Sequence, residues 1–481
     1  MVSVLRFLVA LFLCAHVSLL AFAEEDAVLP AASTILDRVK AANELCLQQT
    51  PSFTTEVRII EHKKAIGKKV KKVRGKKKVE QQWRITREKK EVITQRPVVL
   101  CAFDEQDSSW HIIEIRVPYP QRGEFAFTLQ TPGYRLERVG GTGVARLTFN
   151  AYRTTDRGEQ KLIVYRYLHS WFSPLSLAKG NGPHLLDDVR FVSYTPSSPA
   201  LLNDATLPLG MRYLYGELME VYKELRESGE HSKTFPKELL ADVIDWRIPY
   251  ALAANEQMDH DKFTADAWGT TANVFNEFAL NGPETFMWSF SNFEYKGRIE
   301  HAAGVMQFTN HMGTYDSVRR DCPRAHIDPQ FLRGAQDLRN ALKAAICLLD
   351  VELSRLPVGA HMLYRSNPPV GGVYPVIAYN AGGGRAKSAY NAITANGIDL
   401  ETTDLDLPEQ VFVRQGRTRL SGKKKGQSVL LRVLPSETEM YIKKYMYVLE
   451  FIEQFQSELV PIAPPSPKKD NGTALSHNLA K

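Results

Sequence analysis

The chain has 481 residues, of which 44% are hydrophobic and 24% charged, and its 61 Lys and Arg residues outnumber 54 Asp and Glu for a formal net charge of +7. This length suits two to four domains with real cores, and the composition excludes wholesale disorder, a collagen-like repeat and a small disulfide scaffold. The charge is uneven: residues 61–90 hold 14 Lys and Arg and 3 Glu, a local net of +11, which leaves the remainder slightly acidic.

Residues 1–23 have the features of a secretory signal peptide. Arg6 precedes an apolar run from Phe7 to Leu13, and Ala21-Phe22-Ala23 places small residues at positions −3 and −1 of a cleavage site. We therefore expect an exported protein of the periplasm, cell envelope or extracellular space, with an uncleaved N-terminal anchor as the alternative. Residues 24–49 are expected to form a linker with a short helix.

Four cysteines follow the signal: Cys46, Cys101, Cys322 and Cys347. An even number in an exported protein permits disulfides, and four cysteines allow three pairings. A bond between Cys322 and Cys347 would stay inside one domain, in which case Cys46 meets Cys101. The spacing has no CxxC or Cys/His pattern, so we expect no metal site.

Residues 50–200 predict a β-rich domain, because short β-branched and aromatic stretches alternate with Gly, Pro, Asn and Asp at 110–117, 123–129 and 161–167. The basic segment 61–90 lies at its front and predicts a long hairpin or a mobile excursion. Such a run is either a solvated, self-repelling segment or an electrostatic contact, centred on residues 63–78, to an anionic wall or membrane. Nucleic acid is not an expected partner of an exported protein.

Residues 205–460 have helical periodicity, and a Pro-rich, disordered tail is expected at 461–481. The fold class predicted for the chain is therefore α+β, with a β-rich N-terminal domain followed by an α-helical one. The expected helices are Met211 to Ser228, Ile248 to Phe263, Arg333 to Leu356 and Thr438 to Leu459.

Three short motifs stand in the helical part: Gly304-Val-Met306-Gln307, Ala378-Tyr379-Asn380-Ala-Gly382 and Pro435-Ser-Glu437-Thr-x-x-Tyr441-Ile442. In sequence and in order they resemble the G-x-M-Q, A-Y-N-A-G and P-x-E-T-x-x-Y-V motifs of the soluble-type lytic transglycosylases, over roughly residues 240–460. Each motif alone is a weak signal, and the first two also fit core packing and a helix C-terminus. The three in order are a stronger one.

The resemblance implies a lysozyme-like catalytic domain that cleaves the bond between N-acetylmuramic acid and N-acetylglucosamine in peptidoglycan glycan strands, without a cofactor. One carboxylic acid protonates the bridging oxygen and then acts as base on the muramyl 6-hydroxyl, which yields a 1,6-anhydro product. By the same resemblance, Met306 and Gln307 would line the glycan subsites. Tyr379 would hydrogen-bond near the acid, and Asn380 would contact substrate or brace the loop.

The acid itself departs from the family spacing, which points to Ser289, a residue that cannot do this chemistry. The remaining candidates for the acid are Glu256, Glu284, Glu294 and Glu300. Glu256 is preferred, because Ile248, Leu252 and Glu256 follow at helical spacing and put the carboxylate at the end of an apolar stripe. Glu294 is the runner-up.

If Glu256 is the acid, Gln257 stands where the family usually has Ser, and some 30 residues are inserted before the Met-Gln motif. One role expected for this insertion is a lid. Asp259, His260 and Asp261 follow on the same predicted helix and raise two alternatives, a metal site, which we disfavour, and a water-positioning carboxylate. The second alternative would make the protein a muramidase like goose-type lysozyme. A non-catalytic wall-binding protein on a degenerate lysozyme fold is the third function considered.

Overall fold

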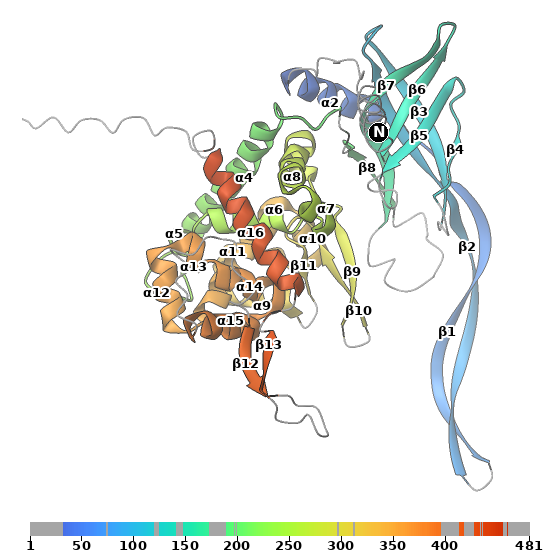
Figure 1. Cartoon of the computed structure of the whole chain (residues 1–481). Coiled ribbons are helices and arrows are strands. Elements are labelled where there is room, and N and C mark those ends of the chain that lie inside the picture. Colours follow the sequence, from blue (N-terminus) through green and yellow to red (C-terminus); the bar gives the residue numbers. More distant parts are fainter. Residues whose placement is uncertain are drawn as a thin grey trace, which may run out of the picture.

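The computed structural model describes residues 32–73, 76–119, 125–140, 148–172, 189–196, 198, 200–295, 298–310, 313–395, 413–417, 428–432, 434, 436–455 and 459. The predicted signal peptide and the predicted tail both lie outside these residues. Within them the chain has the mixed α+β class expected from the sequence, with most of the strands preceding most of the helices (Figure 1).

The N-terminal part is an antiparallel sheet. Its central strand order is β4-β3-β2-β7-β6-β5, β1 pairs with β2, and β8 pairs with β7. The strands are β1 (Thr54–Val73), β2 (Lys76–Asp104), β3 (Ser109–Pro118), β4 (Thr128–Leu129), β5 (Tyr134–Gly140), β6 (Thr148–Thr155), β7 (Gly158–Phe172) and β8 (Val189–Tyr194). Side chains alternate between the two faces of a strand, so one face of β2 presents Val98 and Leu100 to a core with Ile113 and Ile115 of β3.

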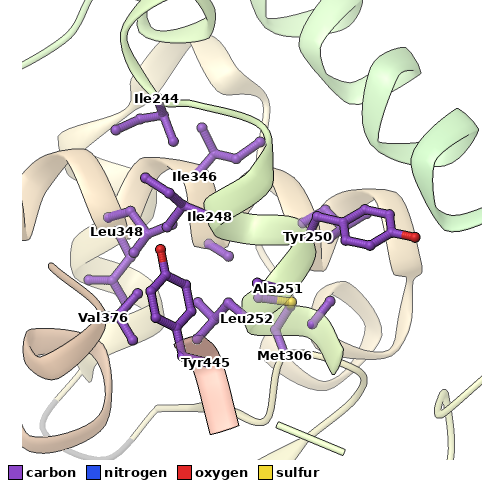
Figure 2. Close-up of a cluster of buried hydrophobic side chains, with 14 of the residues drawn as sticks. Ile244, Ile248, Tyr250, Ala251, Leu252, Met306, Ile346, Leu348, Val376 and Tyr445 are labelled. Carbon is purple, nitrogen blue, oxygen red and sulfur yellow. The ribbon is translucent and has the colours of Figure 1, made fainter. Parts of the chain in front are cut away.

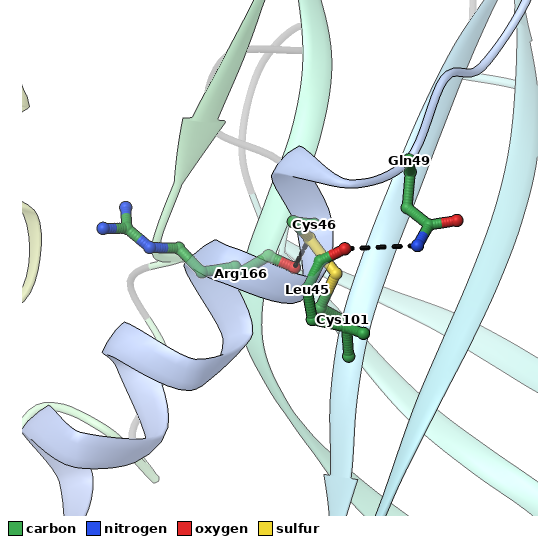
Figure 3. The surroundings of a disulfide bond; sticks show 5 residues. All are labelled: Leu45, Cys46, Gln49, Cys101 and Arg166. Atoms are coloured by element: carbon green, nitrogen blue, oxygen red, sulfur yellow. Dashed lines mark hydrogen bonds between the residues drawn. A yellow bond between two sulfur atoms is a disulfide. The ribbon is translucent and has the colours of Figure 1, made fainter.

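The other face of the sheet is covered by helix α2 (Ala32–Leu47), which is longer than the short helix expected there. Ile35 and Val39 of α2 pack against Val99 and Phe103 of β2. A disulfide joins Cys46, at the end of α2, to Cys101 of β2 (Figure 3). This is one of the pairings left open by the sequence.

The second pairing, Cys322 with Cys347, is not formed. Both thiols are free and buried within the helical core, where burial raises the pKa of Cys347 well above its usual range. The structure therefore has one disulfide among the described cysteines.

The helical part follows from residue 207 and contains a small three-stranded sheet of order β11-β10-β9. Its helices are α4 (Leu207–Ser228), α5 (Leu240–Val243), α6 (Arg247–Asn255), α7 (His260–Ala265), α8 (Ala267–Asn281), α9 (Thr314–Asp321), α10 (Phe331–Gln336), α11 (Leu338–Ser354), α12 (Val358–Ser366), α13 (Pro368–Gly371), α14 (Val373–Ala381), α15 (Gly383–Ala395) and α16 (Ser436–Gln454). Short 3₁₀ helices η3 (Gly282–Glu284) and η5 (Pro323–Ala325), and strands β9 (Phe290–Tyr295), β10 (Arg298–Ala303), β11 (Phe308–Thr309), β12 (Val413–Arg417) and β13 (Ser428–Arg432), complete the described elements.

Helix α6 runs through the centre of the helical core. Ile248, Leu252 and Met306 lie together with Ile346 of α11 and Tyr445 of α16 in one buried cluster (Figure 2). Every α6 residue from Ile248 to Asn255 is buried, because other elements surround the helix. The predicted apolar stripe is therefore only part of what α6 buries.

Two predicted helices are each broken in the structure. The helix expected from Ile248 to Phe263 ends at Asn255 and resumes as α7, whose N-cap is Asp259. The helix expected from Arg333 to Leu356 is interrupted at Asp337, whose carboxylate caps α11 by accepting the backbone N–H of Asn340. An Asp within a helical pattern can cap and so begin a new helix. The prediction followed the periodicity and did not use this signal.

Hydrogen bonds join the sheet to the helical part through α8. Arg166 of β7 donates from Nη1 to Oδ1 of Asn281 over 3.0 Å, and Tyr194 of β8 donates its hydroxyl to the carboxylate of Glu277 over 3.1 Å. The segment expected as an inserted lid thus contains a buried structural helix: α8 packs so closely on α4 that a Cβ at Gly210 would lie 1.7 Å from the carbonyl oxygen of Phe275.

Candidate active site

Glu256 lies directly at the C-terminal end of the buried helix α6. Its backbone N–H donates to the carbonyl of Leu252 over 3.0 Å, so the residue completes the last turn as the C-cap. Its side chain is half-buried. The apolar helix therefore carries a carboxyl group from the core to the edge of the protein interior.

Burial and two polar groups set the electrostatics of Glu256. Burial raises the pKa of its carboxyl from 4.5 to about 7, while the hydrogen bond donated by the hydroxyl of Tyr441 and the charge of Lys444 act in the opposite direction. Desolvation disfavours the charged form more strongly here than these two partners favour it. Glu256 is thus balanced between its acid and its carboxylate near neutral pH.

Lys444 of α16 explains why α6 ends where it does. Its Nζ donates to the carbonyl oxygens of Asn255 and Met258 over 3.1 and 2.9 Å, and Nδ2 of Asn255 donates to the carbonyl of Tyr441 over 3.0 Å. A helix end leaves carbonyl groups without helical partners, and here a side chain about 190 residues away in the sequence supplies one.

The break between α6 and α7 also bears on the alternatives involving Asp259 and His260. The two residues do not share a helix with Glu256, and the carboxylate of Asp259 accepts the N–H of Lys262 as the N-cap of α7, which lowers the pKa of Asp259. The predicted shared helical face does not exist. The proposed metal ligands and the proposed water-positioning group are accordingly not brought together on one helix.

The Met-Gln motif forms the turn between strands β10 and β11. Gly304 follows β10 with φ +73°, and a Cβ at this position would lie 1.6 Å from the carbonyl oxygen of Ala335. Only glycine fits this conformation and this close approach. Met306, expected to line a glycan subsite, is instead fully buried in the core beside α6 (Figure 2), and its backbone carbonyl is the part that contributes to the site.

Gln307 sits at the end of this turn with φ +44°, an uncommon conformation for a residue with a side chain. Its amide Nε2 donates to Oγ of Ser289 over 3.0 Å and to the carbonyl of Gly304 over 2.8 Å, and Oε1 accepts from Oγ of Ser291 over 3.0 Å. These bonds hold the strained backbone. Ser289, where family spacing would place the acid, supports this turn instead.

Tyr379, in the second motif, reaches the same turn from α14. Its hydroxyl donates to the carbonyl of Met306 over 2.7 Å, and its ring packs edge-on against Phe308, with 5.7 Å between the ring centroids. Burial, and then the charge of Glu256, raise the pKa of Tyr379 well above its usual range. Tyr379 is therefore near the acid as expected, although the hydroxyl bonded to the carboxyl belongs to Tyr441 of the third motif.

Asn380 links the second and third motifs. It is exposed at the end of α14, and its Oδ1 accepts the hydroxyl of Thr438 in α16 over 2.9 Å. This contact braces the first turn of α16 against the end of α14. Glu437, treated as structural, lies exposed in the first turn of α16, where a negative charge suits the helix dipole.

Gln257 is a site residue whose role sequence reasoning missed. Its Nε2 donates to the carbonyl oxygens of Gly304 and Val305 over 3.2 and 2.6 Å, so the residue after the acid holds the Met-Gln turn against the end of α6. The signal was its position next to Glu256, where it replaces the family's Ser.

The other candidate acids lie elsewhere. Glu294 and Glu300 belong to the paired strands β9 and β10, and Glu294 stands opposite Ile299 toward the far end of that hairpin. Four residues separate Glu294 from Phe290, which pairs next to the turn, so about 13 Å of strand lies between them. Glu284 ends η3 with an oxygen 3.8 Å from Nη1 of Arg166, at the junction with the sheet.

One group of three possible metal ligands occurs among the described residues: Asp104, Asp107 and His111 of the sheet. The guanidinium of Arg153 already lies among them, with Nη2 2.8 Å from Oδ2 of Asp107 and 3.4 Å from Oδ2 of Asp104, and Nη1 3.3 Å from Nε2 of His111. An arginine thus supplies the positive charge that this cluster attracts, and Glu256 is not part of it.

In comparisons with protein-family models, curated proteins and solved structures, none matches this chain. None of the helices in the described part of the chain has the length and apolar character required to span a membrane.

Proposed function

We propose that the protein is a peptidoglycan lytic transglycosylase in which Glu256 acts first as acid and then as base. The observation that carries the proposal is a carboxyl group at the end of a buried helix that accepts a hydrogen bond from Tyr441 of the third motif; burial raises its pKa to about 7. The first motif is tied to the same place by Gln257, and the second by Tyr379. Motifs separated in sequence by more than 100 residues thus converge on one ionisable group.

The reaction needs a group that gives up a proton and takes one back. Protonated Glu256 donates its proton to the bridging oxygen as the bond from that oxygen to C1 of N-acetylmuramic acid breaks. The resulting carboxylate accepts the proton of the muramyl 6-hydroxyl as O6 bonds to C1, which closes the 1,6-anhydro ring and restores the acid without water. A pKa near neutrality suits both half-reactions.

The surroundings of Glu256 favour this one-carboxylate mechanism over the muramidase alternative. Hydrolytic glycosidases generally use two carboxyl groups, about 5 to 10 Å apart. The ionisable groups that shift the pKa of Glu256 are Tyr441 and Lys444, and the carboxylate of the nearby Asp259 caps α7.

The test is digestion of purified sacculi followed by mass spectrometry of the soluble muropeptides. We expect products lighter by one water than hydrolytic muropeptides, and we expect Glu256→Gln to abolish their release while Glu294→Gln does not. Hydrated products would identify a muramidase. Sacculus binding without release of products would identify a wall-binding protein. Loss of activity only in Glu294→Gln would identify Glu294 as the acid.

Export is part of the proposal. A disulfide such as Cys46–Cys101 persists in oxidising compartments and is rare in the cytosol, which agrees with the signal peptide expected at residues 1–23. The mass of the secreted protein should correspond to a chain that begins at Glu24. A cell-associated protein that retains residues 1–23 would favour the uncleaved anchor instead.

A further inference from the structure

The hairpin of β1 and β2 extends far beyond the sheet to which it belongs (Figure 1). Strand β2 pairs with β3 only from Gln95 onward and with β7 only from Val98 onward, whereas β1 and β2 pair with each other out to Val73 and Lys76. Nineteen residues from Thr55 to Val73 correspond to about 60 Å of strand. A ribbon of only two strands is marginally stable in water by itself, so one with this length calls for a partner.

Residues of like charge oppose each other across the two strands of the hairpin. Near the tip, Lys71 pairs with Lys78 and Lys72 with Lys77, directly across the two strands. Like charges in opposing positions destabilise a sheet. Residues 61–90 as a whole carry a net charge of +11, which an anionic partner would neutralise.

One face of the hairpin also presents apolar residues to solvent. Val57 and Ile59 are 66% and 63% exposed, and Ile85, which the register places on the same face, is exposed as well. The same register places charged residues between these apolar positions: Glu91 opposite Val57, Lys89 opposite Ile59, and the ion pair of Glu61 with Arg87. Further along the hairpin, Ala65 pairs with Trp83 and Val70 with Val79.

We propose that the β1–β2 hairpin binds to the surface of an anionic lipid bilayer. The exposed side chains of Val57, Ile59 and Ile85 would enter the headgroup region while basic residues of the hairpin contact lipid phosphates, the arrangement of amphipathic basic segments at membrane interfaces. A wall polymer or a nucleic acid would neutralise the charge and leave Val57 and Ile59 in water. An anionic bilayer would both neutralise the positive charge of the hairpin and remove its exposed apolar side chains from water.

The first test is co-sedimentation of the mature full-length chain with vesicles. We expect binding to phosphatidylglycerol–phosphatidylcholine vesicles, little binding to phosphatidylcholine alone, and weaker binding as salt rises. Val57→Ser with Ile59→Ser should lower partitioning at least tenfold. The matched control, Val358→Ser with Met362→Ser, removes two residues that are 70% and 68% exposed on α12 and should leave binding unchanged.

The second test separates charge from position. Replacement of three hairpin lysines by Gln should lower partitioning roughly 100-fold, at about fivefold per lysine near an anionic surface. Replacement of three exposed lysines of the helical part should have little effect. The hairpin lysines are Lys71, Lys72 and Lys77, and the controls are Lys223, Lys237 and Lys387.

Insertion can be followed directly at Trp83. The difference in fluorescence between the wild-type chain and Trp83→Phe should shift to the blue with anionic vesicles and be quenched by brominated lipid. The proposal would be overturned if the protein does not bind vesicles or if the fluorescence of Trp83 does not shift. It would also be overturned if the Val57 and Ile59 substitutions leave vesicle binding unchanged and the protein binds a soluble polyanion equally tightly. Sacculus digestion by the same variants reports on the proposed catalytic function separately.

Discussion

Removal of the Tyr441 hydroxyl is the sharpest test of how the site tunes its acid. This hydroxyl donates a hydrogen bond to Oε1 of Glu256, and the bond favours the carboxylate form. In Tyr441→Phe the carboxylate loses this partner while the burial that raises its pKa remains. The pKa of Glu256 should therefore rise above about 7.

The size of this rise follows from the strength of the bond. A hydrogen bond to a charged group contributes about 1.5–3 kcal/mol, and one pKa unit corresponds to about 1.4 kcal/mol, so the rise should be roughly one to two units. Because the first step needs protonated Glu256, activity falls as pH rises through the pKa of this group. The descending limb should move to higher pH by the same one to two units in Tyr441→Phe.

The assay is the initial rate of muropeptide release from sacculi across about pH 5 to 9. Tyr445→Phe is the matched control, since its hydroxyl lies in the same helix, is equally buried and donates to the carbonyl of Pro369 over 3.2 Å instead of to Glu256. A descending limb that stays in place or moves to lower pH in Tyr441→Phe would refute the electrostatic argument. An equal shift in Tyr445→Phe would show a general packing effect.

Three further predictions concern stability. Burial raises the pKa of Glu256 from 4.5 to about 7, so the folded protein holds more protons than the unfolded chain between these values, and this contribution to stability is lost as pH rises. The free energy of unfolding of Glu256→Gln, relative to wild type, should therefore increase by on the order of 3 kcal/mol as the pH rises from about 4 to about 8 in urea titrations. A difference that stays constant with pH would contradict the raised pKa of Glu256. Gly304→Ala should cost about 3 kcal/mol or more, against roughly 1 kcal/mol for Gly133→Ala, because both have positive φ but only Gly304 is crowded; equal losses in thermal denaturation would exclude the collision. Cys46→Ser with Cys101→Ser should lower the stability of the sheet by about 4 kcal/mol in urea unfolding, since the bond closes a loop of 55 residues, and an unchanged midpoint would exclude a stabilising disulfide.

Local sequence patterns predicted many of the elements, and their limits have physical causes. Alternation of apolar residues located β3 and β7, and helical periodicity located α4. The basic run, for which a long hairpin or a mobile excursion was expected, forms the β1–β2 hairpin. The expected strand at 123–129 is reduced to Thr128 and Leu129 among the described residues, because only these two pair with β3. Pairing is decided by a neighbouring strand and not by the propensity of the segment itself.

Glu256 was chosen from the sequence because an apolar helix leads into it. The pattern that predicted its burial lies within a few residues of it in the sequence. Its partners are not local: Tyr441 and Lys444 come from a helix about 185 residues further along the chain. The same applies to Met306, whose position in a motif suggested a subsite residue, while packing against α6 makes it part of the core.

The sequence by itself determined the α+β class, the order of the three motifs and the concentration of positive charge near the start of the sheet, since composition, periodicity and spacing are properties of the chain alone. Tertiary structure decided that α6 stops at Asn255, that Gln257 reaches the turn after Gly304, and that Tyr441 bonds to Glu256. The pKa of an acid depends on how much water its neighbours exclude and on which donors reach it. Both are set by segments that meet only when the chain is folded.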